Sequence, residues 1–196
     1  MIAALPVTAA LGWSAAGAAI ADGLSRQLAP GSRRDRLGIF LLAGAAGVAA
    51  LALGGGLSAA LTCSGLTAAA VLDARSGYLV DELTLPTAAL GFASAACAGS
   101  AASALLGMAG LTVPAAAAGF FSRGTWLGWG DVKALLALGA GFGIERGSIA
   151  LALGCAFGAA AAIVMHRRNL RFGPYLAAGS VAALALGAGG APGATS

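Results

Sequence analysis

The sequence predicts an all-α membrane protein, a bundle of about eight transmembrane helices. Two features of composition lead to this prediction: hydrophobic residues make up 59% of the chain and charged residues only 9%, with a mean hydropathy of +0.90. The third feature is that long stretches contain no Asp, Glu, Lys or Arg. A soluble helix of that length would need a polar face, so a soluble domain rich in alanine and glycine is disfavoured.

The charge-free stretches locate the individual helices. One crossing takes about 20 residues, so each of the two longest stretches, 37–72 and 83–122, holds two crossings. The first span is expected to be retained, because it lacks the positive residues that begin a signal peptide. The expected spans are residues 2–21, 37–53, 57–73, 85–101, 103–121, 126–144, 148–165 and 175–192. We expect residues 1–56 to form two N-terminal helices joined by a basic loop, which the orientation derived below makes cytoplasmic, and residues 57–196 to form a six-helix core.

Basic residues are distributed unevenly over the expected connections. Of the eleven Lys and Arg residues, ten lie in or beside connections that follow odd-numbered spans, and only Arg146 follows an even-numbered span. Because cytoplasmic loops of membrane proteins retain Lys and Arg, we expect those connections to be cytoplasmic and both termini to lie on the outer side. The net charge of +4 is then explained by basic residues in cytoplasmic loops that face anionic lipids. The lipid bilayer is therefore an expected partner, and nucleic acid is not.

The three cysteines do not indicate a metal site or a disulfide framework. Cys63, Cys97 and Cys155 lie singly in apolar segments without a C-x-x-C pair, so we expect buried small hydrophobic residues and no metal or other cofactor. Small residues four positions apart, such as Gly154 and Gly158, predict closely packed helices. Chemistry is therefore expected from polar residues at the ends of the spans.

Four acidic residues remain as candidates for that chemistry. Three of the seven acids lie near arginines, where ion pairing in solvent explains them: Asp22, Asp35 and Glu145. The other four are Asp73, Asp81, Glu82 and Asp131. Asp73 ends the third span and Asp131 begins the sixth. Spans four and five leave the cytoplasmic side and return to it, so these two carboxylates are expected to lie at the same edge of the membrane.

A pair of carboxylates at one membrane edge has the chemistry of an aspartic protease. The two can share a proton and activate a water molecule between them. The ionised carboxylate takes a proton from the water that attacks the scissile carbonyl, and the protonated one donates to the carbonyl oxygen. A sixth span that starts near Thr125 places Asp131 below the interface, on a backbone loosened by Gly128 and Gly130.

Several neighbours of the pair have simpler explanations. Asp81 and Thr84 are expected to cap the fourth span, with Pro86 in its first turn. Lys133 is either an anchor that reaches the interface or a residue that tunes the nearby carboxylate. Arg75 is either a topology determinant or a charge that stabilises a neighbouring carboxylate.

Together these residues resemble the type IV prepilin peptidases, the GxGD aspartic proteases of the bacterial inner membrane. The resemblance covers about residues 57–192. It rests on Gly128–Asp131 followed by Val132 and Lys133, on Asp73 with residues 81–86 after it, and on residues 171–175. It implies that Asp73 and Asp131 form a catalytic pair on the cytoplasmic side. It also implies that the substrates are prepilins or pseudopilins of type IV pili or type II secretion, cleaved after a glycine between a short basic leader and a hydrophobic helix.

Two departures limit what the resemblance implies. Family members usually have proline before the position of Asp81, where this chain has Val80. Bifunctional members carry two zinc-binding C-x-x-C pairs after the first span and also N-methylate the product, and this chain has no such pairs. The resemblance therefore implies peptidase activity without methyltransferase activity.

Two other functions stay open on the sequence. An inactive scaffold homologue is disfavoured by the intact aspartate pair. A proton-coupled transporter is disfavoured because no acid lies in the middle of a span and no inverted repeat is visible. Among proteases, presenilin-like enzymes are disfavoured because they place the partner aspartate beside a tyrosine, which this chain does not. Archaeal preflagellin peptidases are disfavoured because they usually lack the two leading spans expected here.

Overall fold

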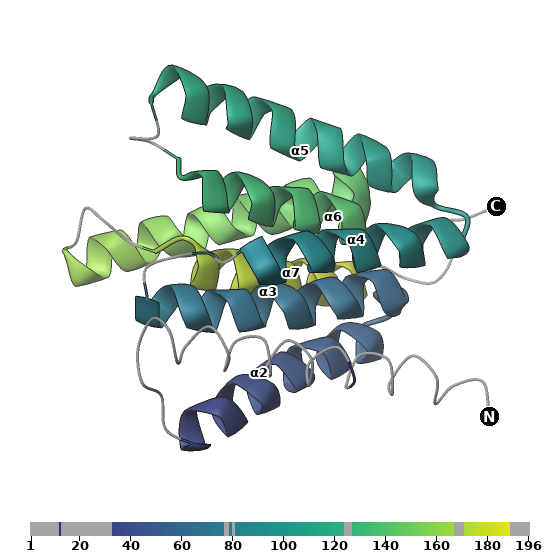
Figure 1. Cartoon of the computed structure of the whole chain (residues 1–196), viewed down its shortest axis with the longest axis horizontal. Helices are drawn as coiled ribbons and strands as arrows, with labels where there is room; N and C mark the ends of the chain where they lie inside the picture. The colour runs from purple at the N-terminus through teal and green to yellow at the C-terminus, as the bar shows by residue number, and fades with distance from the viewer. Residues whose placement is uncertain are drawn as a thin grey trace.

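The structure is a computed structural model, and it describes residue 12 and residues 33–76, 79, 81–123, 127–166 and 171–188. Within this part of the chain all regular secondary structure is helical, which confirms the all-α prediction. Figure 1 shows the helices as one bundle, with α2 and α5 on opposite outer sides. The helices are α2 (Arg33–Ala52), α3 (Gly56–Ser76), α4 (Asp81–Cys97), α5 (Ala101–Phe121), α6 (Trp129–Met165) and α7 (Gly173–Ala188).

Helix α6 is a hairpin of two helical arms rather than a straight rod. Gly143 interrupts it with φ 69° and ψ −172°, a conformation that glycine adopts at little cost. A Cβ atom at Gly147 would lie 4.0 Å from the Cα atom of Gly139, whereas the same stretch of straight helix would span about 12 Å. The two arms, 129–142 and 144–165, therefore run back along each other, as Figure 1 shows. They correspond to the expected spans 126–144 and 148–165.

Helix α4 begins and ends earlier than the expected span 85–101. It starts early because Asp81 and Glu82 occupy its first turn, where the unpaired N–H groups favour acidic side chains. It ends early because Gly99, with φ 77°, lets the chain turn. Pro86 consequently lies inside the helix, and its expected place in the first turn is wrong.

Helix lengths and composition are those of a membrane protein. Three helices of the described part are long and apolar enough to cross a bilayer: Gly56–Arg75, Ala101–Phe121 and Trp129–Met165. Two shorter apolar helices are Leu37–Ala52 and Gly173–Gly187. The expected first span, residues 2–21, lies outside the described residues apart from Gly12, so the total of about eight crossings stays a prediction.

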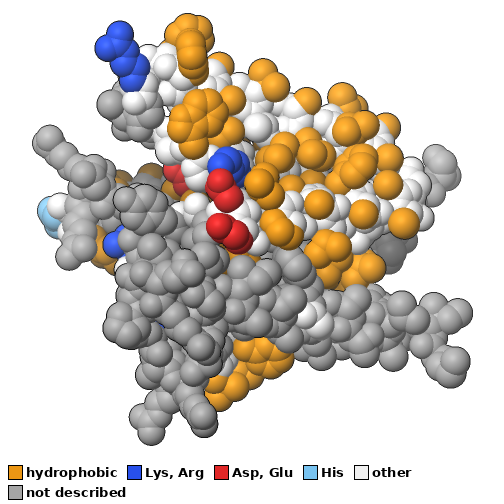
Figure 2. All heavy atoms as spheres, viewed as in Figure 1, with side chains coloured by type: hydrophobic (Ala, Val, Ile, Leu, Met, Phe, Trp, Pro, Cys, Tyr) orange, Lys and Arg blue, Asp and Glu red, His pale blue; other side chains and the backbone are white. Residues whose placement is uncertain are grey.

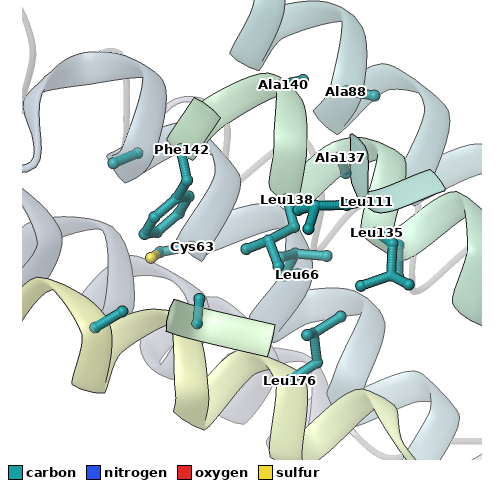
Figure 3. Packing of buried hydrophobic residues seen from close by; sticks show 14 of the residues in the cluster. Cys63, Leu66, Ala88, Leu111, Leu135, Ala137, Leu138, Ala140, Phe142 and Leu176 are labelled. Atoms are coloured by element: carbon teal, nitrogen blue, oxygen red, sulfur yellow. The ribbon is translucent and has the colours of Figure 1, made fainter. Parts of the chain in front are cut away.

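The interior of the bundle combines very close helix contacts with larger apolar side chains. Gly107 of α5 lies against Gly139 and Gly143 of α6, without room for a side chain at any of the three positions. Figure 3 shows leucines such as Leu66 and Leu138 packed together between the helices. The glycine-rich composition is therefore used for packing, as lipid supplies no hydrophobic drive between helices.

The outer surface also carries many large hydrophobic side chains. Helix α5 exposes large hydrophobic side chains such as Phe120 and Phe121, and Figure 2 shows orange side chains over much of this face. Cys63 is buried, whereas Cys97 and Cys155 are exposed, so the expectation of three buried cysteines is wrong for these two. Apolar neighbours do not indicate burial in a chain whose outer surface faces lipid.

The two ends of the bundle hold different residues. The C-terminal end of α3 and the first turns of α4, α6 and α7 meet at one end, which carries Asp73, Lys133 and Arg171. At the opposite end a cavity is lined by the first turn of α5, the Gly143 turn and Arg146. Among the described residues this separation agrees with the uneven distribution of basic residues along the sequence.

Candidate active site

Asp73 lies near the C-terminal end of α3 and is almost completely buried, with 5% of its surface exposed. Its Oδ2 atom accepts a hydrogen bond from the N–H of Gly173, the first residue of α7, at 3.3 Å. Its backbone carbonyl accepts a hydrogen bond from Nη1 of Arg171 at 2.8 Å, and the carbonyl of Ala74 accepts one from the same atom. The α6–α7 connection therefore contacts both the side chain and the backbone of Asp73.

Asp131 lies in the first turn of α6 and is half-buried. The helix begins after Gly128, whose backbone is extended at φ −74° and ψ 151°. The Gly128 carbonyl accepts hydrogen bonds from the N–H groups of Asp131 and Val132, at 3.1 and 3.3 Å. The backbone of Gly128 also hydrogen-bonds the Asp131 carboxylate, which thus completes the N-terminus of the helix.

Helix α6 begins at a different residue from the one expected from the sequence. The sixth span was expected to start near Thr125, whereas α6 begins at Trp129, so Asp131 lies in the first turn rather than deeper. The helix starts at Trp129 because the backbone of Gly128 directly before it is extended rather than helical. Residues 124–126 lie outside the described part of the chain.

The structure brings Asp73 and Asp131 together. They come from different helices, yet they lie near enough for the charge of Asp73 to influence the Asp131 carboxylate. Both lie at the end of the bundle where α3 ends and α6 begins. The topological expectation that the two acids meet at one edge therefore agrees with the geometry. Two neighbouring carboxylates repel each other when both are ionised, so such a pair is suited to holding one proton and exchanging it.

Gly130 is required by packing rather than by backbone freedom. It lies within regular helix, so the expectation that it loosens the backbone is wrong. A Cβ atom at this position would lie 2.8 Å from the Cβ atom of Leu79, in the α3–α4 connection. At Gly128 an added Cβ atom would lie 3.5 Å from Oδ2 of Asp131, an ordinary contact. The two glycines that precede Asp131 therefore differ: a side chain would clash at Gly130 but would make only an ordinary contact at Gly128.

Lys133 and Asp81 form an ion pair between α6 and α4. The two side chains are 34% and 48% exposed, so the pair is solvated. Neither role expected for Lys133, as an anchor at the interface or as a residue that tunes the nearby carboxylate, included this ion pair. Asp81 therefore lies in the first turn of α4 and also forms an ion pair with a side chain of α6. Applying the same topological argument to the acids at the start of the fourth span would have placed Asp81 at the same end of the bundle as Lys133, without identifying the pair.

The remaining candidates lie around this end of the bundle. Arg75 is exposed in the last turn of α3, where a cation stabilises the carbonyls that end a helix. Glu82 is exposed in the first turn of α4, and Thr84 is buried. Val80 lies outside the described residues. In the part of the chain that the structure describes, no three His, Cys, Asp or Glu side chains come together in a way that could hold a metal ion.

Comparison with known proteins identifies similar sequences. The model of a family described as the type IV leader peptidase family matches residues 60–163, which include both aspartates. Two curated relatives from Burkholderia pseudomallei, strains 1026b and K96243, are each named prepilin leader peptidase/N-methyltransferase. Each is 36% identical over 170 residues, which cover 76% of this chain and 54% of the relative. The chain thus spans about half the length of these relatives. No solved structure matches it.

Proposed function

This chain belongs to the type IV leader peptidase family, and we propose that it is a membrane aspartic endopeptidase that removes the leader peptide from type IV prepilins or prepilin-like proteins. The observation that carries the proposal is the meeting of Asp73 and Asp131 at one end of an apolar bundle. Charged groups in such a chain are costly, and a pair of them at one place indicates a functional site.

The proposed reaction uses the two carboxylates as one acid and one base. The ionised carboxylate takes a proton from a water molecule while the water oxygen attacks the scissile carbonyl carbon. The protonated carboxylate donates its proton to the carbonyl oxygen, which gives a tetrahedral intermediate. When the C–N bond breaks, the leaving amine takes the proton that the pair holds, and a hydroxyl of the intermediate gives a proton back to the pair as the carboxyl product forms, so the dyad returns to its singly protonated form.

Neighbouring residues support this chemistry in different ways. Gly173 and Gly128 supply backbone hydrogen bonds to the two carboxylates. Gly130 lets the α3–α4 connection lie against the first turn of α6. The Lys133–Asp81 pair links the first turns of α6 and α4 beside Asp131. We propose these residues and Arg75 as site-supporting, and only the two aspartates as catalytic.

The proposed location is the cytoplasmic face of the bacterial inner membrane, with both termini in the periplasm. Lys133 and Arg171 lie at the same end as the dyad, whereas Arg146 lies at the other end. Because basic residues accumulate in cytoplasmic loops, this supports a cytoplasmic site. A basic leader that stays in the cytoplasm would then present its cleavage site at the membrane edge.

The proposal is limited to the peptidase reaction. The relatives' names combine a leader peptidase with an N-methyltransferase, and this chain matches about half of their length. The sequence contains no C-x-x-C pair of the kind that accompanies methyltransferase activity in the family it resembles.

Cleavage of a prepilin by matched variants tests the proposal. The probe is a synthetic prepilin, with a short basic leader that ends in glycine before a hydrophobic helix, co-expressed with each variant. We expect Asp73→Asn and Asp131→Asn each to abolish cleavage while the protein still accumulates in the membrane. Glu145→Gln, which changes an acid remote from the dyad, is the control and should leave cleavage intact. Cleavage by either aspartate variant would refute the proposed mechanism.

A further inference from the structure

The C-terminal end of α3 is completed by Arg171. The last four carbonyls of a helix have no N–H donor within the helix, and in α3 these include the carbonyls of Asp73 and Ala74. Nη1 of Arg171 donates to both, at 2.8 Å for Asp73. A cation is also favourable at this position, because it opposes the partial negative charge of the helix C-terminus. Arg171 therefore holds the part of the α3 backbone that carries Asp73.

The N-terminal end of α7 is completed by Asp73 itself. The first N–H groups of a helix have no acceptor within the helix. The N–H of Gly173, the first residue of α7, finds its acceptor in Oδ2 of Asp73, and this contact is buried. The next turn is regular, since Tyr175 and Leu176 donate to the carbonyl of Phe172 at 3.1 and 3.0 Å. Asp73 is thus the point where the two helix ends meet.

The contact at Gly173 leaves no space for a side chain. An added Cβ atom would lie 2.9 Å from Oδ2 and 3.3 Å from Cβ of Asp73, and 3.4 Å from the Cα atom of Ala70. Two of these three atoms belong to the aspartate side chain, and the third belongs to the backbone of α3. Any residue larger than glycine would therefore push directly on the buried carboxylate.

We propose that Arg171 and Gly173 are positioning residues for the dyad: Arg171 fixes the backbone of Asp73, and Gly173 fixes the direction of its carboxylate toward Asp131. The inference rests on the proposed function. The observations behind the inference are the contacts that these two residues make with Asp73. Both contacts converge on one buried acid, which is more than the capping of two helix ends requires.

Kinetics of detergent-solubilised protein on the synthetic prepilin test the role of Arg171. We expect Arg171→Ala to lower kcat about 10- to 100-fold, since a displacement of about 1 Å at a reacting group has such an effect. KM should change by less than about threefold, because the contact orients the carboxylate and does not bind substrate. Arg171→Lys should recover part of kcat, as an ammonium can still donate to one of the carbonyls. Arg146→Ala removes an exposed arginine at the opposite end and is the matched control.

Unfolding in detergent tests Gly173 without any reliance on catalysis. We expect Gly173→Ala to lower the midpoint of thermal unfolding in the wild-type background. In an Asp73→Ala background the carboxylate that the new methyl group meets is absent, so Gly173→Ala should lower the midpoint much less. Gly38→Ala, at a helical glycine with nothing within 4 Å of an added Cβ atom, is the control and should have the same small effect in both backgrounds.

The possible results separate this inference from the proposed function. Unchanged kcat in Arg171→Ala, or a higher KM with unchanged kcat, would overturn the positioning role. Equal shifts from Gly173→Ala in the two backgrounds would also overturn it, and this comparison decides the matter where Arg171→Ala does not accumulate as folded protein. A wild-type protein that cleaves no prepilin counts against the proposed function, while the unfolding comparison still reports on the contact between Gly173 and Asp73.

Discussion

Replacement of Gly130 by alanine should disturb the dyad through the α3–α4 connection. The new Cβ atom would lie 2.8 Å from the Cβ atom of Leu79. Two carbon atoms that are not bonded approach to about 4.0 Å in ordinary contact. The connection or the first turn of α6 must therefore move by about 1 Å, and Asp131 is the residue that follows Gly130 in that turn.

The size of the effect follows from that displacement. Overpacking of a well-packed contact costs about 1–3 kcal/mol of stability, and a 1 Å displacement of a catalytic group lowers the rate by about 100-fold. We therefore expect Gly130→Ala to lose most of its kcat while it remains folded. Gly128→Ala should be at least about tenfold more active than Gly130→Ala, because its added Cβ atom meets Asp131 at an ordinary 3.5 Å.

The assay compares initial rates of leader cleavage with the midpoint of thermal unfolding, measured on the same detergent-solubilised samples. A second substitution identifies the clashing atom. Leu79→Gly removes the Cβ atom that the new methyl group meets, whereas Leu79→Ala keeps it. Activity should therefore return in Gly130→Ala with Leu79→Gly, and stay low in Gly130→Ala with Leu79→Ala. The reasoning fails if Gly130→Ala is as active as wild type. It also fails if Leu79→Gly alone is active but does not rescue Gly130→Ala.

Two further expectations concern stability. Lys133→Glu should lower the unfolding midpoint by placing two carboxylates together, and Asp81→Lys in the same chain should restore it; the exposed pair contributes about 0.2–1 kcal/mol, and equal midpoints for the single and double variants would contradict the ion pair. Gly143→Ala should destabilise the fold by about 1–3 kcal/mol, because the residue has a positive φ and the added methyl group would meet Oγ of Ser103. Gly187→Ala, with open space around it, is the matched control, and equal losses would show that the Gly143 turn is not strained by a side chain.

The proximity of Asp73 and Asp131 could be predicted from the sequence because it follows from the topology of the chain. A carboxylate in an apolar chain is costly, so few acids had to be considered, and alternate spans return the chain to the same side. Asp73 and Asp131 are separated by one such excursion through α4 and α5. The hairpin in α6 could be anticipated for a related reason, since Glu145 and Arg146 interrupt an apolar stretch that is too long for one crossing.

The contacts around the dyad could not be predicted in the same way. Topology places Lys133, Asp81 and Arg171 at one end of the bundle, but it does not decide which partner each long side chain reaches. The contact of Gly130 with Leu79 depends on how a connection folds over a helix, and no periodicity reports on that. The expected burial of Cys97 and Cys155 was wrong for a different reason. Apolar residues cover both the interior side and the lipid-facing side of a membrane helix, so apolar neighbours in the sequence do not identify the buried side.

The contact at Asp73 depends on the turn at Gly143, although the two lie at opposite ends of the bundle. A straight α6 of 37 residues would extend about 55 Å, nearly twice the thickness of the hydrocarbon core. Helix α7 would then begin far from the C-terminal end of α3. Because the second arm runs back along the first, α7 begins at the dyad end, and the N–H of Gly173 comes to 3.3 Å from Asp73. A single left-handed glycine at the far end is therefore a condition for the hydrogen bond that orients the buried carboxylate.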